Sequence, residues 1–160
     1  MKEICVQTKF MKKLAFLLIA AFSIGAVSAQ SLNPVSWSFH SKKLGEGVYE
    51  IQMIATIEKG WHVYAQEQPK DAIAIPTSFS FNKNPLVNFD GKVKEVGKME
   101  KYKDKVLGVT SHQYSDKVVF VQKVKLKGKA KTNVTGKLEF QTCNDEKCLP
   151  PKTVNLSIAL

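Results

Sequence analysis

Apolar and polar residues alternate with a period of two along much of the chain. The clearest run is 48–57, which is rich in branched and aromatic side chains and follows the turn residues Gly45 and Gly47. Such alternation is typical of β-strands that bury one face. The same pattern predicts further strands at 61–64, 77–81, 118–126, 134–140 and 154–158. No segment shows a convincing amphipathic helical period.

Two stretches lack this alternation and are predicted to be loops. Residues 97–108 are rich in lysine, and residues 66–76 have a proline near each end. A succession of short strands joined by turns and loops predicts an all-β fold, a β-sandwich of immunoglobulin-like type. The sequence shows no internal repeat.

The N-terminus reads as a secretory signal peptide covering residues 1–29. Lys12 and Lys13 precede the apolar run 14–24, and the small residue Ala29 marks the expected cleavage position. Met11 is then the expected true start. We expect one domain at residues 30–160, in the periplasm or secreted, where a disulfide can persist. That part has no apolar segment long enough to span a bilayer.

The formal net charge is +10, and every basic residue is a lysine. Specific recognition of bases and phosphates relies on the planar fork of arginine, so we expect no nucleic-acid partner. Lys123, Lys125, Lys127 and Lys129 alternate with other residues, which on a strand would place them on one solvated face. The alternatives for these lysines are a nucleic-acid or heparin patch and an attraction to acidic partners.

Two cysteines, Cys143 and Cys148, remain once the signal peptide, with Cys5, is removed. Four residues separate them, on the connection between the last two predicted strands. Pro150 and Pro151 follow and cannot pair in a sheet, so they hold the chain extended. Three interpretations stay open: a structural staple that contributes only ~2 kcal/mol for so short a loop, a redox-active pair, or a metal-binding thiol pair.

Metal binding is the least favoured of these interpretations, and we predict neither a metal nor another cofactor. Two thiols rarely complete a zinc site, and His40, His62 and His112 show no ligand spacing. Copper(I), which tolerates two thiolates, is a distant alternative.

Redox exchange would require a thiolate at one cysteine. Asp145 and Glu146 lie between the cysteines and would oppose that negative charge, whereas Lys147, next to Cys148, would favour it. The region also has no Cys-x-x-Cys motif at a helix start, which excludes a thioredoxin.

The sequence around the cysteines resembles the N-terminal periplasmic domain of the DsbD family of thiol:disulfide interchange proteins. The resemblance rests on a strand ending in Gln141-Thr142-Cys143, a short acidic loop, and Cys148-Leu149-Pro150-Pro151. Residues 33–39 and 59–64 also resemble that family's opening strands. The resemblance covers residues 33–160.

Membership would imply a sandwich whose Cys143 and Cys148 shuttle electrons as a protein-disulfide reductase. The electrons would come from a thioredoxin-like domain supplied by a membrane thiol reductase, and would pass to a periplasmic disulfide isomerase or to cytochrome c maturation proteins. We expect that donor to be a separate protein and the mixed disulfide to form at Cys148. The competing hypothesis is a non-catalytic β-sandwich binding module with a structural disulfide.

The resemblance also assigns the surroundings of the cysteines. His62 and Tyr64 stand where family members carry aromatic residues, while Leu149, just before Pro150, replaces an aromatic residue. The family's cap loop shields the disulfide with a phenylalanine, and the matching stretch here, at Val106 and Leu107, offers only aliphatic groups. The loop between the cysteines is one residue shorter than in well-known members.

Overall fold

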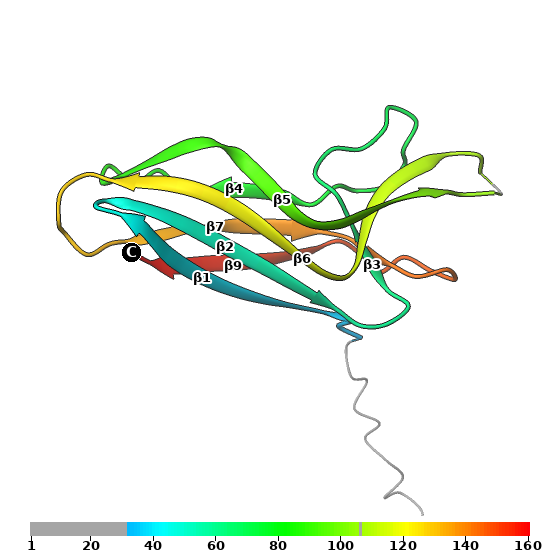
Figure 1. Cartoon of the computed structure of the whole chain (residues 1–160). Coiled ribbons are helices and arrows are strands. Elements are labelled where there is room, and N and C mark those ends of the chain that lie inside the picture. Colours follow the sequence, from blue (N-terminus) through cyan, green and yellow to red (C-terminus); the bar gives the residue numbers. More distant parts are fainter. Residues whose placement is uncertain (1–31, 106) are drawn as a thin grey trace, which may run out of the picture. The chain divides into compact units, whose positions relative to one another are not determined.

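Nine β-strands follow one another in this computed structural model, which describes residues 32–105 and 107–160, and that part of the chain contains no helix (Figure 1). The predicted signal peptide and Val106 lie outside the described residues. The strands are β1 (Val35–Gly45), β2 (Val48–Ile57), β3 (His62–Tyr64), β4 (Ser78–Phe81), β5 (Val87–Lys103), β6 (Thr110–Leu126), β7 (Asn133–Phe140), β8 (Thr142–Cys143) and β9 (Lys152–Ala159).

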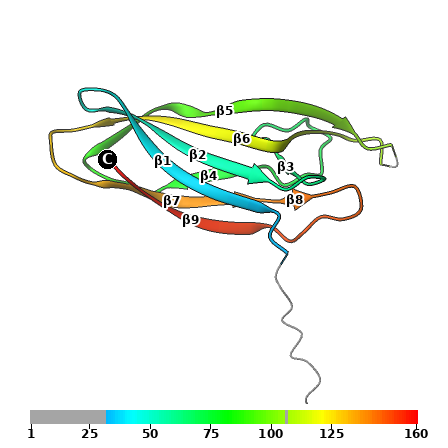
Figure 2. The same ribbon diagram turned by 60° about the horizontal axis from the view of Figure 1, so that its bottom comes forward.

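The strands form two antiparallel sheets that face each other (Figure 2). The larger sheet contains β1, β2, β3, β5, β6 and β8, and the smaller one has the order β4-β7-β9. Long β6 organises the larger sheet, because it pairs with β2 and then β3 along one edge and with β5 along the other. The arrangement confirms the predicted all-β, immunoglobulin-like sandwich.

The inward faces of the two sheets supply the core of the unit Asn33–Leu160. Phe120 of β6 is fully buried at its centre, and its ring centroid lies 5.8 Å from that of Trp37 on β1 and 5.0 Å from that of Phe79 on β4. Trp37 also packs edge-on against Phe140 of β7, at 5.3 Å. These aromatic contacts join the two sheets.

The alternation located most strands correctly. Strand β2 has the predicted bounds, and β7 buries Leu138 and Phe140 while exposing Lys137 and Glu139. Residues 66–76 form the predicted loop. No helix among the described residues is long and apolar enough to cross a membrane.

The loop predicted at 97–108 is wrong, because strand β5 continues to Lys103 and β6 already begins at Thr110. Strand β5 forms an edge of the larger sheet, and most of its side chains are exposed on both faces. A strand without a buried face has no one-sided apolar alternation, and lysines are common on such edges because they discourage pairing with other chains.

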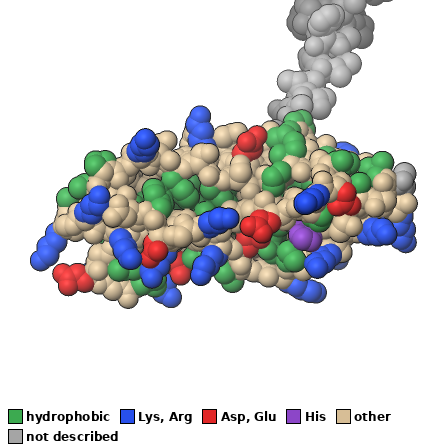
Figure 3. Space-filling model, turned by 90° about the horizontal axis from the view of Figure 1, so that it is seen from above, with side chains coloured by type: hydrophobic (Ala, Val, Ile, Leu, Met, Phe, Trp, Pro, Cys, Tyr) green, Lys and Arg blue, Asp and Glu red, His purple; other side chains and the backbone are tan. Residues whose placement is uncertain are grey.

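The lysine alternation also needs a correction. Lys123 and Lys125 lie on β6 and both contact Asp90, at 3.8 and 3.3 Å. Lys127 and Lys129 lie beyond the end of β6, in the loop that turns at Gly128 with a positive φ of 82°. The four lysines therefore do not share one strand face. Figure 3 shows lysines spread along the viewed face, with fewer acidic side chains among them.

The chain changes sheets just before the first of the two cysteines. Strand β7 belongs to the smaller sheet, whereas β8 pairs with β3 of the larger sheet. Gln141 is the one residue between these strands. This crossing places the cysteine loop at one end of the sandwich, where both sheets meet (Figure 2).

Candidate functional site

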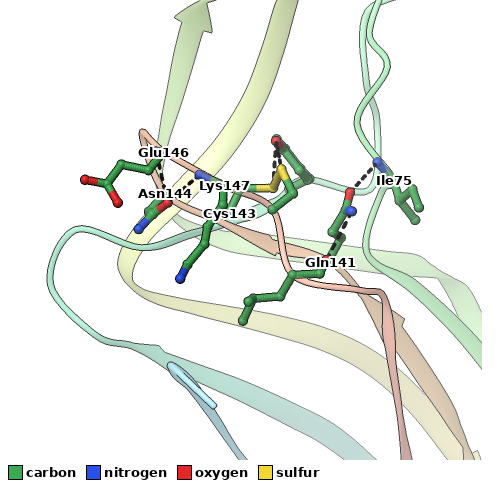
Figure 4. The surroundings of a disulfide bond; sticks show 9 residues. Ile75, Gln141, Cys143, Asn144, Glu146 and Lys147 are labelled. Carbon is green, nitrogen blue, oxygen red and sulfur yellow. Dashed lines mark hydrogen bonds between the residues drawn. A yellow bond between two sulfur atoms is a disulfide. The ribbon is translucent and has the colours of Figure 1, made fainter. Parts of the chain in front are cut away.

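Cys143 and Cys148 form a disulfide on the connection between β7 and β9, with a Cα–Cα distance of 4.0 Å (Figure 4). The two sulfur-bearing residues differ sharply in exposure. Cys143, in β8, is only 1% exposed, whereas Cys148 is exposed at the surface. A partner in solution would therefore reach the bond from the side of Cys148.

The loop between the cysteines is held by hydrogen bonds of its own (Figure 4). The amide of Asn144 donates to the carbonyl of Lys147 at 2.9 Å, and the amide of Leu149 donates to that of Thr142 at 2.9 Å. The Asn144 side-chain oxygen accepts from the amides of Glu146 and Lys147, at 3.0 and 2.8 Å. An Asn side chain that accepts in this way is a common local stabiliser of turns. The disulfide is thus not the only link that closes the loop.

Strand β3 supplies the side chains beside the disulfide. His62 pairs in register with Cys143, and Tyr64 lies two residues further, on the same face of the strand. The Tyr64 hydroxyl donates a hydrogen bond to Sγ of Cys143 at 3.2 Å and lies 3.9 Å from Sγ of Cys148. The rings of His62 and Tyr64 meet edge-on, with centroids 5.3 Å apart.

Burial shifts the pKa of each of these side chains in the direction that favours its neutral form. It lowers the pKa of His62, although the nearby carboxylates of Asp145 and Glu100 act in the opposite direction. Burial also raises the pKa of Tyr64, and Tyr102 and Asp104 add to this effect. This direction favours the protonated hydroxyl, which is the form that donates to Sγ of Cys143.

A hollow of about 280 Å³ adjoins the disulfide, between the cysteine loop and the β5–β6 turn. Both cysteines line it. Other residues that line it include His62, Tyr64, Ile73, Tyr102, Asp104, Leu107, Gln141 and Asp145. Ile73 and Leu107 are apolar and strongly exposed, at 72% and 59%. The rim of the hollow is therefore partly apolar, which is common at protein contact sites.

Gln141 connects the cysteine loop to the loop at 66–76 (Figure 4). Its side-chain oxygen accepts from the amide of Ile75 at 3.4 Å, and its side-chain nitrogen donates to the carbonyl of Leu149 at 3.3 Å. The residue at which the chain changes sheets thus also fixes one wall of the hollow.

The structure gathers several of the residues that the sequence indicated. His62, Tyr64, Asp145 and Leu107 line the hollow together with the cysteines. Other predicted residues do not line it: Glu146 is exposed at the turn, and Leu149 (half-buried) and Pro150 (exposed) follow Cys148. Val106 lies outside the described residues.

Sequence reasoning missed Ile73, Tyr102, Asp104 and Gln141. Ile73 lies in a loop that carried no motif, and Tyr102 lies in the stretch taken for a loop. Gln141 belongs to the motif Gln141-Thr142-Cys143 noted in the sequence. Its hydrogen bonds to Ile75 and Leu149, however, can be found only from the three-dimensional structure. Within the two described ranges, no three His, Cys, Asp or Glu side chains gather closely enough to hold a metal ion.

Comparison with solved structures shows the same fold. The N-terminal periplasmic domain of ScsB from Proteus mirabilis matches with a TM-score of 0.51 at 16% identity, over 81% of this chain and 49% of that one. The chain therefore spans about half the length of that structure. The reduced DsbD N-terminal domain of Neisseria meningitidis matches with a TM-score of 0.49 at 15% identity, over 76% and 83% of the two chains.

A third solved structure is the complex between the DsbD N-terminal and PilB N-terminal domains from Neisseria meningitidis. It matches with a TM-score of 0.47 at 14% identity, over 80% and 87% of the two chains. A search of curated proteins gave no match.

Sequence comparison extends this likeness from fold to family. The model of the family described as "Thiol:disulfide interchange protein DsbD, N-terminal" matches residues 32–159. That range contains all nine strands and the Cys143–Cys148 disulfide. The chain belongs to the family of DsbD N-terminal domains.

Proposed function

We propose that the chain is a periplasmic or secreted thiol:disulfide exchange protein, acting as a protein-disulfide reductase. Cys143 and Cys148 relay two electrons from a membrane or thioredoxin-like reductase to partner proteins. The observation that carries the proposal is the unequal exposure of the bonded pair: Cys148 is exposed and Cys143 is 1% exposed. Such a pair has one sulfur open to attack and one protected leaving group.

Reduction begins when a thiolate of the reductase attacks Sγ of Cys148. The Cys143–Cys148 bond breaks, a mixed disulfide forms at Cys148, and Cys143 leaves as a thiolate that then takes up a proton. The second thiol of the reductase then loses its proton and attacks the first reductase sulfur, the one bonded to Cys148 in the mixed disulfide. Cys148 is released and protonated, so two electrons and two protons have moved to this chain.

Donation runs through the same steps in reverse. The Cys148 thiolate attacks the disulfide of a partner, such as a disulfide isomerase or a cytochrome c maturation protein, and Cys143 then resolves the mixed disulfide. Tyr64 supports both directions, because its hydroxyl donates to Sγ of Cys143, where negative charge develops during reduction. A hydrogen bond to a charged group stabilises it more than one to a neutral group.

Two single variants test the assignment of roles. Cys143→Ser leaves the exposed thiol and Cys148→Ser leaves the buried one. We expect Cys143→Ser to react with an aromatic disulfide reagent, and with an oxidised thioredoxin-like protein, at least about tenfold faster than Cys148→Ser. Equal rates, or faster reaction of Cys148→Ser, would contradict the assignment. The wild-type reduction potential, measured against glutathione, should lie above about −300 mV, because inert structural disulfides lie below it.

A non-catalytic binding module is the second candidate. It is favoured by the apolar rim at Ile73 and Leu107, which offers contact area independent of sulfur chemistry. The double variant Cys143→Ser, Cys148→Ser separates the two functions. A binding module keeps its partner affinity in this variant, whereas an exchange protein loses all electron transfer.

A further inference from the structure

The end of the sandwich opposite the disulfide is formed by three connections that lie side by side (Figures 1 and 2). They are the β1–β2 turn, the 82–86 loop and the 127–132 loop. The amide of Leu126 donates to the carbonyl of Gly47 at 2.7 Å, and the amide of Lys127 donates to that of Leu86 at 2.8 Å. The amide of Leu160, just after β9, donates to the carbonyl of Thr132 at 2.9 Å. These bonds fix the three connections against one another.

This end is strongly cationic, and we call it the lysine end. Glu46 is its single acidic residue within 42–47, 82–86 and 127–132. Its lysines are all exposed: Lys42, Lys43, Lys83, Lys127, Lys129 and Lys131. In the part of the chain that the structure describes, Lys123 and Lys125 form salt bridges with Asp90, whereas none of the six lysines at this end forms one.

The disulfide end differs in its charge balance. There, Lys101, Lys103 and Lys105 are interspersed with Glu100 and Asp104, and Lys147 follows Asp145 and Glu146 in the cysteine loop, so positive and negative side chains are mixed. The positive charge at the lysine end is therefore a local feature as well as a property of the whole chain.

Three of these lysines surround a second hollow, of about 550 Å³. Lys43, Lys129 and Lys131 line it together with Tyr49 and Leu126, and Glu46 is the one acidic side chain in this lining. Convergent ammonium groups around a concave surface concentrate positive potential and attract anions. Ammonium groups bind phosphates as point charges without reading bases, which fits a repeating anionic surface better than a specific nucleic-acid sequence.

An exposed leucine lies within the same cluster. The register of β1 and β2 shifts between Lys43 and Gly45, which leaves Leu44 outside the pairing, and it is 49% exposed. An apolar side chain next to lysines gains little from a soluble polyanion. At a bilayer it can enter the interface between headgroups and acyl chains while the lysines contact the headgroups.

We propose that the lysine end binds the surface of an anionic lipid bilayer, with Leu44 entering the interface. Because the disulfide lies at the opposite end of the sandwich, this attachment leaves Cys148 facing away from the lipid and open to partners. The proposal does not rest on the redox function, since no residue of the lysine end lines the disulfide hollow.

The test uses the segment from Gln30 to Leu160, which contains the whole compact unit Asn33–Leu160 with its core and excludes the apolar run 14–24. Binding is measured by co-sedimentation with phosphatidylglycerol–phosphatidylcholine vesicles and with pure phosphatidylcholine vesicles. We expect binding to the anionic vesicles alone, weakened at least about tenfold when ionic strength rises from about 0.02 to about 0.3 M.

Two triple variants of identical charge change locate the surface. Lys127, Lys129 and Lys131 are changed to Glu in one, and Lys101, Lys103 and Lys105, near the disulfide, are changed to Glu in the other. We expect the first to lose at least about tenfold in vesicle affinity and the second to lose much less. All six positions are exposed, and circular dichroism checks the fold. Equal losses would overturn the proposal, because net charge alone would then explain the binding.

Leu44 distinguishes a bilayer from a soluble polyanion. We expect Leu44→Ser to weaken binding to anionic vesicles while leaving binding to heparin unchanged. Stronger binding to heparin than to vesicles, an unaffected vesicle affinity in Leu44→Ser, or no binding to anionic vesicles would each overturn the proposal.

Discussion

The hydroxyl of Tyr64 lies 3.2 Å from Sγ of Cys143, the buried member of the disulfide, and 3.9 Å from Sγ of Cys148. Tyr64 belongs to β3, about 80 residues earlier in the chain than either cysteine. Pairing of β3 with β8 brings them together. The phenol, whose pKa is raised by burial, therefore contacts the sulfur that leaves in the proposed reduction.

We predict that Tyr64→Phe slows reduction of the disulfide by a thioredoxin-like reductase by at least about tenfold, because a hydrogen bond to a charged group contributes about 1.5–3 kcal/mol. Stopped-flow kinetics measures the rate. Tyr102→Phe is the matched control, since Tyr102 lines the same hollow. Equal rates in wild type and Tyr64→Phe would remove Tyr64 from the mechanism.

Reduction of the disulfide should lower the free energy of unfolding by only about 2 kcal/mol, because the closed loop is short. The turn should also persist, because the Asn144 side chain and the bond from Leu149 to Thr142 hold it. Denaturant unfolding of the oxidised and reduced forms measures the difference. Hydrogen exchange at the Lys147 and Leu149 amides reports on the turn. Global unfolding upon reduction would assign the disulfide a structural role.

His62 makes stability depend on pH. Its pKa in the folded state lies below the ordinary value of 6.5, chiefly because of burial. The unfolded chain consequently binds more protons than the folded one in this range. The contribution of His62 is therefore fully present above about pH 6.5 and is lost as pH falls through its folded-state pKa. We expect wild type to lose more stability than His62→Gln between about pH 7.5 and about pH 5. Parallel pH profiles of unfolding free energy would contradict this expectation.

Gly136 allows β4 to approach β7 closely. A Cβ added at Gly136 would collide with the carbonyl oxygen of Ser80, and it would lie 3.0 Å from Cα of Phe81. Both are backbone atoms, so β4 would have to shift. We predict that Gly136→Ala lowers the free energy of unfolding by about 1–3 kcal/mol. Gly45→Ala is the control, because a Cβ at Gly45 meets nothing within 4 Å. Equal stabilities of the two variants would show that β4 is free to move.

Local pattern predicted the strands that bury one face and missed the one that does not. In β2, Ile51, Met53 and Ala55 are fully buried at alternate positions, and its bounds followed from this alternation. Strand β5 lies at an edge with both faces largely exposed, so its sequence resembled a lysine-rich loop. Apolar and polar residues alternate in a strand only where one face is buried and the other is exposed.

The residues of the candidate site also fall into those that the sequence indicated and those that only the structure shows. The two cysteines are close in sequence, and their spacing alone marked them as a pair. The family resemblance added His62, Tyr64 and Leu107. Ile73, Tyr102 and Gln141 reach the hollow through strand pairing and loop packing between distant segments. No local motif records such contacts, so these residues required the three-dimensional structure.

The self-supporting turn between the cysteines has a consequence for recognition. Because hydrogen bonds within the loop keep its shape, we expect the oxidised and reduced forms to share nearly the same surface everywhere except at two sulfur atoms. A partner could then distinguish the reduced form from the oxidised form only by direct contact with Cys148 and its neighbours. Both forms would then bind a partner through the same surface and compete for it. Only the reaction at Cys148 would distinguish them.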